Sequence, residues 1–463
     1  MHCATLLRTA CALAIFATQS AAQSSSSTYQ SIPYTDIYTI QPSSPGPTFT
    51  SPLTVSTSVP TGPNLTNGLA LTPPMGWSSW NGFGTNINEK LLRDTIDTFV
   101  SSGLQAAGFE FINLDDGWQR YPGSRLDNPL EADPVKFPSG IKALADYAHS
   151  KGLKLGIYSG PGETTCAGYT GSQGHEEEDA KMFASWGIDH LKYDSCCSHE
   201  FAPESVVQSV VLKMSQALLN SGRGIVFHAC HCGWANSWEW AAQYGANQWR
   251  IGQDISDDFN YPGNRMKYFF DVLDLIDRGN PLAQYAGPGH WNDFDMLIIG
   301  LNGNSSHEGA GCSNVEYRTH FSMWAMVCSP LLIGSDVRTL NSDSMETLLN
   351  PEIIAISQDS LGNAASTVGV GNQDGGDLQV FAKSMADGSF AVALLNRGSV
   401  TAEMSISPSR DLTVEWPKYT VRDVWKHKTF GPYDTAYTVE VISHEAKILR
   451  LYEVVANASM PLL

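Results

Sequence analysis

Short apolar runs alternate along the middle of the chain with longer segments in which apolar residues recur at helical spacing. The segments 89–102, 141–151, 176–186 and 203–221 have apolar residues every three or four positions, which predicts amphipathic helices. An alternation of this kind is typical of βαβ units around a parallel sheet. The apolar runs number about eight, as many strands as close a barrel. The predicted strands are 74–77, 111–114, 153–158, 188–193, 224–228, 248–251, 290–296 and 330–333.

Beyond Gly362 the helical spacing gives way to alternation of apolar and polar residues. A period of two is typical of strands with one buried face, and Ala386-Asp387-Gly388 supplies a turn. We therefore predict an α/β fold, with a (β/α)8 TIM barrel over residues 68–362 and a small C-terminal antiparallel β-sandwich domain over residues 363–463. The strands predicted for the second domain are 378–384, 390–395, 400–406, 419–425 and 447–452.

The N-terminus has the features of a secretory signal peptide. Arg8 precedes an apolar stretch over residues 10–17, and small residues precede Gln23, so we expect residues 1–22 to be removed. The apolar stretch is too short to span a bilayer. Residues 23–67 are rich in Ser, Thr and Pro and contain no Lys or Arg, which predicts a linker without a packed core. We expect a secreted, extracellular protein.

Composition and charge narrow the class of partner. Of the 463 residues, 42% are hydrophobic and 16% are charged, which allows a sizeable core and excludes bulk disorder. The formal charge of -19 repels phosphate backbones and anionic lipid, so we expect no nucleic acid and no membrane as partner. The 12 Trp and 17 Tyr residues favour a neutral, polar ligand instead. The oligomeric state is left open.

Most of the predicted barrel strands end in polar or aromatic residues. The second leads into Asp115-Asp116-Gly117-Trp118, the fourth into Lys192-Tyr193-Asp194, and the sixth runs from Arg250 towards Asp254. In a parallel barrel these ends share one face, where the active site forms. A single Asp at a strand end is often no more than a helix N-cap. Acids, a Lys, an Arg and Trp at most of the ends together indicate a site.

These residue types suit carbohydrate chemistry. Trp and Tyr rings stack on the C–H faces of sugars, and Asp and Lys bind hydroxyl groups. Glycoside hydrolysis needs two carboxyls, one a nucleophile or base and the other an acid, and Asp194 and Asp254 are the candidate pair. Lys192 lies two residues before Asp194 and points the same way along the strand, where it would help to keep that carboxylate ionised.

Six motifs occur in order along the predicted barrel, namely Pro74-Met75-Gly76-Trp77 with Trp80, Asp115-Asp116-Gly117-Trp118, Lys136-Phe137-Pro138-Ser139-Gly140, Lys192-Tyr193-Asp194, Trp249-Arg250 with Asp254, and Trp291-Asn292-Asp293-Phe294-Asp295-Met296. Their types and spacing resemble family 27 of the glycoside hydrolases. This family contains α-galactosidases, α-N-acetylgalactosaminidases and β-L-arabinopyranosidases. The likeness runs from about residue 71 to 362, and residues 421–425 and 444–451 resemble the family's C-terminal β-domain.

The resemblance implies a retaining double displacement on a (β/α)8 barrel, with Asp194 as nucleophile and Asp254 as acid/base. In such an enzyme the two carboxyls lie about 5–5.5 Å apart. The resemblance also implies that Asp115 and Asp116 bind the C4 and C6 hydroxyls and that Lys192 reaches O3 and O4. No metal or organic cofactor is implied. The other implied members of the pocket are Arg250 near C2, Trp80 as the stacking platform, and Tyr158 and Asp295 in the wall.

The cysteines depart in part from the family pattern. Cys166 and Cys196 keep a family disulfide beside Asp194, while a second family disulfide is missing because its positions hold Thr85 and Gly117. Oxidising compartments favour disulfides. For the remaining cysteines we expect Cys230 or Cys232 to bond to Cys197, and a bond between Cys312 and Cys328 is a further candidate. Sequons for N-glycosylation begin at Asn64, Asn304 and Asn457.

The end of the fifth strand is the largest departure. Relatives read Cys, then Glu, Asn or Asp, then Trp, whereas this chain reads Cys230-His231-Cys232-Gly233-Trp234. His231 occupies the position that contacts the C2 substituent in relatives, and its bulk favours galactose over N-acetylgalactosamine. The His and Cys residues could instead suggest a metal site. Because residues along a strand alternate faces, ligands this close in sequence do not converge on one ion.

The leading interpretation is a secreted retaining exo-glycosidase, an α-galactosidase, that hydrolyses terminal α-D-galactosyl residues. A β-L-arabinopyranosidase is the closest alternative, because L-arabinopyranose matches galactose except at C6. Asp116 argues mildly for galactose, since β-L-arabinopyranosidases of the family that the chain resembles can replace one Asp of the pair with the longer Glu, which fills the space of the missing C6 group. A non-catalytic sugar-binding protein is the third possibility, and the presence of both Asp194 and Asp254 speaks against it. The aglycone preference is left open.

Overall fold

The computed structural model describes residues 64–195, 203–261, 269–307, 309–368 and 376–455. The predicted signal peptide and almost all of the predicted linker lie outside these ranges, as do Cys196 and Cys197. The predictions for those segments therefore rest on the sequence alone.

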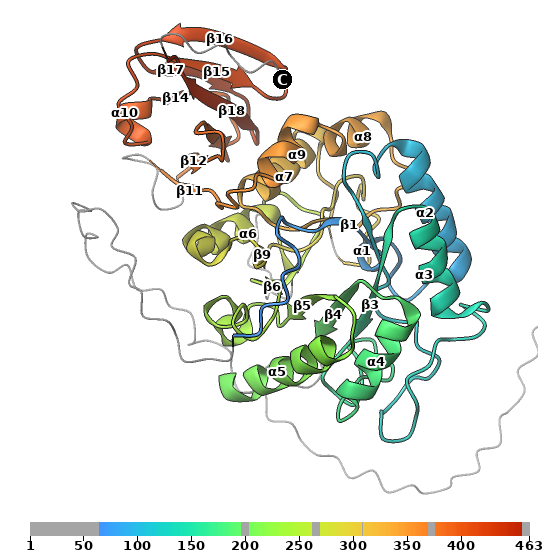
Figure 1. Ribbon diagram of the computed structural model, residues 1–463. Helices are drawn as coiled ribbons and strands as arrows, with labels where there is room; N and C mark the ends of the chain where they lie inside the picture. Colours follow the sequence, from blue (N-terminus) through green and yellow to red (C-terminus); the bar gives the residue numbers. More distant parts are fainter. Residues whose placement is uncertain (1–63, 196–202, 262–268, 308, 369–375, 456–463) are drawn as a thin grey trace, which may run out of the picture. The chain divides into compact units, whose positions relative to one another are not determined.

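Eight parallel strands form the main sheet, in the order β10-β1-β2-β3-β4-β5-β6-β9. At one edge β1 pairs with β10, with Met75 opposite Leu331. At the other edge a parallel bridge from Leu297 to Ile333 connects the segment after β9 to β10. The sheet is thereby closed into a barrel (Figure 1), which confirms the predicted fold class. The strands are β1 (Met75–Ser78), β2 (Phe111–Asn113), β3 (Lys154–Ser159), β4 (His190–Asp194), β5 (Val226–Cys230), β6 (Gln248–Arg250), β9 (Trp291–Asp293) and β10 (Leu331–Ile333).

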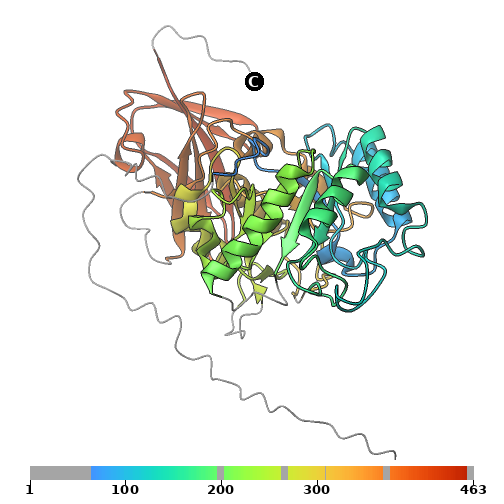
Figure 2. The same cartoon turned by 60° about the horizontal axis from the view of Figure 1, so that its bottom comes forward.

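Helices connect the strands and pack around the outside of the sheet (Figures 1 and 2). In α2, Asn88 caps the first turn with its side chain, and Gly103 ends the helix at a φ of 89°, where glycine is favoured. The face formed by Leu92, Ile96 and Phe99 is fully buried. None of the helices in the described ranges has the length and hydrophobicity that a membrane span requires. The helices are α1 (Trp80–Phe83), α2 (Glu89–Ser102), α3 (Gly140–Ser150), α4 (Glu176–Trp186), α5 (Glu204–Asn220), α6 (Val272–Gly279), α7 (Asn314–Met326), α8 (Ser342–Leu348) and α9 (Pro351–Ser357), with 3-10 turns η1 (Trp234–Glu239) and η2 (Asn280–Tyr285).

The C-terminal domain is an antiparallel β-sandwich with a core of its own. A six-stranded sheet has the order β11-β12-β13-β18-β15-β16, and β14 pairs with β17 in a second sheet. Buried side chains such as Val392, Met404 and Val421 form this core. The strands are β11 (Ser366–Thr367), β12 (Leu378–Ser384), β13 (Phe390–Asn396), β14 (Ala402–Ile406), β15 (Tyr419–Asp423), β16 (Lys428–Tyr433), β17 (Tyr437–Val441) and β18 (Ala446–Glu453), and a short helix α10 (Pro408–Asp411) follows β14.

Cys312 and Cys328 do not form the disulfide suggested by the sequence, because both are free. They flank α7, whose 13 residues span about 20 Å, whereas a disulfide needs Cα atoms within about 7 Å. The Cys328 sulfur instead lies 3.1 Å from the buried ammonium of Lys383. This ammonium also donates to the carbonyls of Ala325 and Ile356, near the C-terminal ends of α7 and α9. Lys383 therefore neutralises two helix ends.

Candidate active site

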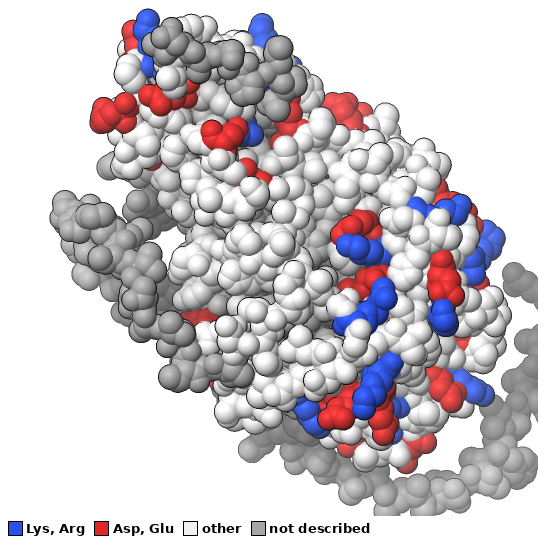
Figure 3. Space-filling model, viewed as in Figure 1, with Lys and Arg blue, Asp and Glu red and all other residues white. Residues whose placement is uncertain are grey.

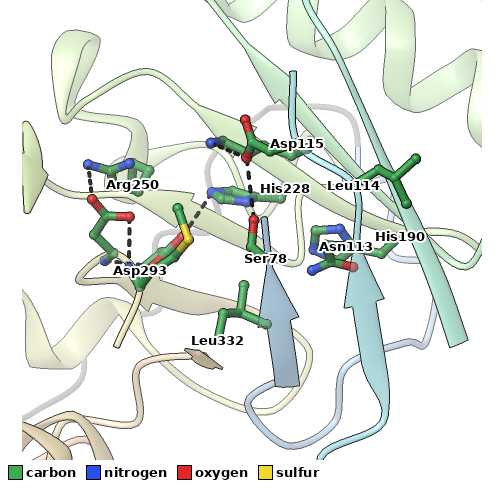
Figure 4. A pocket seen from close by; sticks show the side chains of 12 residues that line it. Ser78, Asn113, Leu114, Asp115, His190, His228, Arg250, Asp293 and Leu332 are labelled. Atoms are coloured by element: carbon green, nitrogen blue, oxygen red, sulfur yellow. Dashed lines mark hydrogen bonds and ion pairs between the residues drawn. The ribbon is translucent and has the colours of Figure 1, made fainter. Parts of the chain in front are cut away.

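Two carboxylates at the carboxyl ends of barrel strands share one ammonium group. Lys192 and Asp194 belong to β4, and Asp115 follows β2. The Lys192 Nζ lies 2.9 Å from Asp115 Oδ2 and 3.7 Å from Asp194 Oδ2. The hydroxyl of Ser78, at the end of β1, also donates to Asp115 Oδ2 at 3.4 Å (Figure 4). The ammonium offsets the repulsion between two largely buried carboxylates.

Asp116 is held by the loop around Cys166. Its Oδ1 accepts from the Thr165 hydroxyl at 2.9 Å, and its Oδ2 accepts from the Ala167 amide at 2.8 Å. Burial raises the pKa of Asp116 to about 6, against the lowering effect of these hydrogen bonds. Cys166 is disulfide-bonded, which fixes the loop that carries both donors. Its predicted partner, Cys196, lies outside the described residues, so that pairing stays a prediction.

A second charge cluster lies at the ends of β6 and β9. Arg250 Nη2 lies 3.0 Å from Asp254 Oδ1 and 3.0 Å from Asp295 Oδ2. Asp295 Oδ2 also accepts from the Ile255 amide at 2.8 Å. Its φ of 74° is unusual for a residue with a side chain. The resemblance placed Asp295 in the pocket wall, and the structure shows it holding Arg250 and the short strand β7 (Asp254–Ile255).

The two candidate catalytic carboxylates have opposite electrostatic surroundings. Burial raises the pKa of Asp194, although Lys192 opposes this effect. Burial acts in the same direction on Asp254, but the neighbouring cations, with Arg250 the strongest, outweigh it and lower the pKa of Asp254 to about 2. The exposed fractions of the two side chains are 8% for Asp194 and 37% for Asp254. Asp194 is therefore the buried member of the pair, and Asp254 faces the solvent.

Neither carboxylate of this pair is a helix cap. The helix that follows β4 begins after Pro203, and the helix that follows β7 begins after Asp271. Among the described residues, neither Asp194 nor Asp254 caps a helix.

His231 lies beside the candidate nucleophile. Pairing of β4 with β5 sets Asp194 opposite Cys230, the residue before His231. The His231 Nδ1 lies 2.5 Å from the hydroxyl of Ser195, and the ring stacks on Trp240 with centroids 6.4 Å apart. Because Ser195 occupies Nδ1, any contact of this ring with a sugar hydroxyl would be made by Nε2.

Cys230 and Cys232 are free, which corrects the prediction that one of them bonds to Cys197. The physical reason is local, because the two thiols contact each other. The hydrogen bond that the Cys230 thiol donates to Cys232, together with burial, raises the pKa of Cys230. In the part of the chain that the structure describes, no group of three His, Cys, Asp or Glu side chains is arranged to hold a metal ion.

Tyr158 and Trp80, the predicted aromatic members of the site, contact its charged residues directly or through one neighbour. The Tyr158 ring centroid lies 5.3 Å from the Lys192 Nζ. The indole N–H of Trp80 donates to His307 Nε2 at 2.9 Å. His307 Nε2 also lies 3.6 Å from Asp254 Oδ2. The sequence analysis missed His307, which belongs to none of the six motifs and lies 227 residues from Trp80.

The loops that lack the family disulfide are held together by a lysine. A Cβ added at Gly117 would lie 2.8 Å from the Cβ of Thr85, so the two positions face each other. The Lys136 Nζ donates to the carbonyl of Thr85 at 3.0 Å and to that of Gly117 at 2.7 Å. Lys136, in the third motif, therefore connects the loop after β1 to the loop after β2.

A small cavity lies inside the barrel, and Asp115, Lys192 and Arg250 line part of it (Figure 4). Its volume is about 20 Å³, enough for one water molecule, and Asn113, His190 and His228 line it. The His228 Nε2 lies 2.9 Å from Asp293 Oδ2, and Asp293 Oδ1 accepts from the Asp295 amide at 2.8 Å. A buried polar layer that the sequence analysis did not assign therefore supports Asp295.

Two family models match the chain. The model described as Alpha galactosidase A matches residues 72–359, and the model described as Alpha galactosidase C-terminal beta sandwich domain matches residues 375–451. The alpha-galactosidase of Cyamopsis tetragonoloba is 43% identical over 383 residues, covering 82% of this chain and 86% of the relative.

Solved structures agree with the family models. The crystal structure of alpha-galactosidase I from Mortierella vinacea is 35% identical, with a TM-score of 0.77, over 84% of this chain and 98% of that one. A GH27 β-L-arabinopyranosidase from Geobacillus stearothermophilus shares the fold, with 23% identity and a TM-score of 0.71, over 84% of this chain and 98% of that one. The chain therefore belongs to family 27 of the glycoside hydrolases, the α-galactosidase family.

Proposed function

We propose that the protein is a retaining exo-glycosidase that releases terminal α-D-galactosyl residues by double displacement, with Asp194 as nucleophile and Asp254 as acid/base. The observation that carries the proposal is a pair of carboxylates, one at the end of β4 and one at the start of β7, each beside a cation. Lys192 lies 3.7 Å from Asp194, and Arg250 lies 3.0 Å from Asp254. Two carboxyls with different surroundings are what this chemistry requires.

The first step needs Asp194 to be ionised. Its burial favours the neutral acid, and the neighbouring Lys192 supplies the charge that opposes this effect. The carboxylate attacks the anomeric carbon as the aglycone leaves, and a covalent glycosyl-enzyme intermediate forms.

Asp254 must carry a proton in the first step and accept one in the second. The neighbouring cations hold the pKa of Asp254 at about 2, so its carboxyl group is ionised before a substrate binds. A bound glycoside covers the side chain, whose exposed fraction is 37%, and the lost hydration raises its pKa. After protonating the aglycone, Asp254 is ionised and can take a proton from the incoming water. The sugar is then released with its configuration retained.

The arrangement of Asp115, Asp116 and Lys192 favours galactose over L-arabinopyranose. Asp115 Oδ1 accepts from the Asp116 amide at 2.8 Å, and the Asp116 carboxylate is fixed by the loop around Cys166. The acceptors are thus held in fixed directions before the sugar binds. A buried acceptor that loses its hydroxyl partner is costly, so a pentopyranose without the C6 hydroxyl should react more slowly.

The surface charge also supports an uncharged substrate. In Figure 3 the acidic and basic side chains occur close together over the helices α2, α3 and α4, and much of the remaining face is uncharged. Lys90 pairs with Asp94 at 2.6 Å, and Lys142 pairs with Asp146 at 2.8 Å. A mixed surface of this kind does not attract a polyanion.

A panel of nitrophenyl glycosides tests the proposal. We expect the kcat/KM for the α-D-galactopyranoside to exceed those for the β-L-arabinopyranoside and the α-N-acetylgalactosaminide, in each case by about tenfold or more. A higher kcat/KM for the arabinopyranoside would favour that alternative. Binding of galactose without hydrolysis of any glycoside would favour a sugar-binding protein.

His231 is proposed to bind the 2-hydroxyl, which a 2-deoxygalactoside lacks. His231→Ala should slow the parent galactoside by about tenfold to a hundredfold, the effect of one hydrogen bond to a partly charged centre. It should slow the 2-deoxygalactoside little, because a shared contact can be removed only once. Ser195→Ala, which releases Nδ1, should show the same pattern with a smaller loss. Equal losses on both sugars would mean that His231 only packs against Trp240.

We also propose that the protein is secreted. The signal-peptide pattern of residues 1–22, the sequons and the disulfide at Cys166 support this. Expression in a secreting host should yield a protein in the medium whose N-terminus is Gln23. Recovery of the unprocessed chain inside the cells alone would contradict the proposal.

A further inference from the structure

The loop that joins β9 to α7 is fixed by one buried carboxylate. Asp257 accepts from the Gly303 amide at 2.8 Å, from the Cys312 amide at 3.3 Å and from the Tyr317 hydroxyl at 3.0 Å. A Cβ added at Gly309 would lie 2.6 Å from the Asp257 amide nitrogen, so the loop approaches the segment after β7 as closely as only glycine allows. Gly303, Gly309 and Cys312 are therefore held against Asp257, three residues after Asp254 in the chain.

His307 belongs to this loop, and both of its ring nitrogens are bonded. Nε2 accepts from the Trp80 indole at 2.9 Å, and Nδ1 lies 3.1 Å from the carbonyl oxygen of Ile255. An indole nitrogen only donates a hydrogen bond, and a carbonyl oxygen only accepts one. The two bonds together therefore require a neutral imidazole with its proton on Nδ1.

The surroundings of His307 hold the ring in place. Its side chain is 7% exposed, and its ring centroid lies 4.9 Å from that of Phe269. The neighbouring Ser306 donates from its hydroxyl to the carbonyl of Trp80 at 2.9 Å. The loop thus binds Trp80 through both its main chain and its indole. His307 also lies beside the candidate acid/base, because its Nε2 is 3.6 Å from Asp254 Oδ2.

We propose that His307 is a positioning residue of the active site, which fixes the orientation of the Trp80 indole and packs beside Asp254. The inference rests on the proposed function, in which Trp80 is the surface on which the sugar stacks. Trp80 begins a helix of four residues, too short to hold a side chain by itself. A ring that is already oriented binds its ligand with a smaller loss of entropy. Loss of the bond should therefore weaken sugar binding more than it slows the chemical step.

Three variants test this assignment. His307→Phe keeps an aromatic ring beside Phe269 but has no acceptor, His307→Gln keeps a carbonyl oxygen that can accept from the indole, and Trp80→Phe keeps an aromatic face without the N–H. We expect His307→Phe to raise the KM for nitrophenyl α-D-galactopyranoside about three- to tenfold, with a much smaller change in kcat. His307→Gln should restore most of the affinity. In the Trp80→Phe background, His307→Phe should add little.

A readout that does not depend on turnover is the indole N–H signal of Trp80 in the NMR spectrum of the 15N-labelled protein. The signal is identified by its absence from Trp80→Phe, and it should shift in His307→Phe. Should His307→Phe fail to fold, His307→Asn replaces it, because the shorter amide does not reach the indole.

The outcomes distinguish a failure of the positioning role of His307 from a failure of the proposed function. An unchanged KM in His307→Phe, or losses that multiply in the double variant, would overturn the positioning role. A native enzyme that cleaves no α-galactoside would instead refute the proposed function. In that case an unshifted indole signal in His307→Phe would overturn the bond between His307 and Trp80 as well.

Discussion

Asp194→Asn is expected to abolish turnover of every α-galactoside, by about a thousandfold or more, while the fold stays intact. The amide has the shape of the carboxylate but cannot form the glycosyl ester. Its neutral group also removes a buried charge, so the thermal midpoint should stay the same or rise. Lys192 keeps Asp115 as a partner at 2.9 Å. Steady-state rates and a thermal melt measure both effects.

The matched control is Asp146→Asn, which makes the same change on the exposed face of α3. Asp146 pairs with Lys142 on the same helix, and an exposed pair of this kind contributes little to stability. The control should keep native kcat/KM. If Asp194→Asn retained more than a few per cent of the native rate, Asp194 would not be the nucleophile.

The loss of rate caused by Asp254→Ala is expected to depend on the leaving group of the substrate. Natural oligosaccharides have poor leaving groups that need a proton, so their rates should fall by about a hundredfold or more, the usual contribution of general acid catalysis. Nitrophenyl galactosides leave without a proton, so their first step should be nearly unaffected. The second step then limits turnover, because the base that activates water is missing.

Added azide separates the two steps in this variant. It attacks the glycosyl-enzyme without a general base, so it should restore turnover of the nitrophenyl substrate and give a galactosyl azide of retained configuration. Asp295→Asn is no suitable control, because Asp295 holds Arg250 at 3.0 Å. Equal losses for all leaving groups, without an azide product, would rule out Asp254 as the acid/base.

The barrel could be predicted because its signals are local. Each strand is a short apolar run, and the predicted helices 89–102 and 176–186 have the same bounds as α2 and α4. The sandwich strand β17 was missed although its residues alternate in burial, whereas β16 was missed for a physical reason. β16 lies at the edge of its sheet with mostly exposed residues, and Gly431-Pro432 interrupts its pattern. An edge strand buries too little surface to leave an alternating pattern.

Of the candidate site, the sequence could predict the residues at strand ends and in the six motifs, but not His307. The strand ends brought Asp115, Lys192 and Asp194 together because parallel strands share one edge. His307 has no such signal, because its partner Trp80 lies 227 residues away and the loop that carries His307 is held by tertiary contacts. The suggested bond between Cys312 and Cys328 is wrong because a helix of 13 residues separates the two cysteines.

The measurement that tests the central claim most directly is the anomeric configuration of the first product, followed by proton NMR during hydrolysis of nitrophenyl α-D-galactopyranoside. A nucleophile at Asp194 and an acid/base at Asp254 predict two inversions, so α-D-galactose should appear first and β-D-galactose only later, by mutarotation. Initial release of β-D-galactose would show a single inversion by water and would contradict the account.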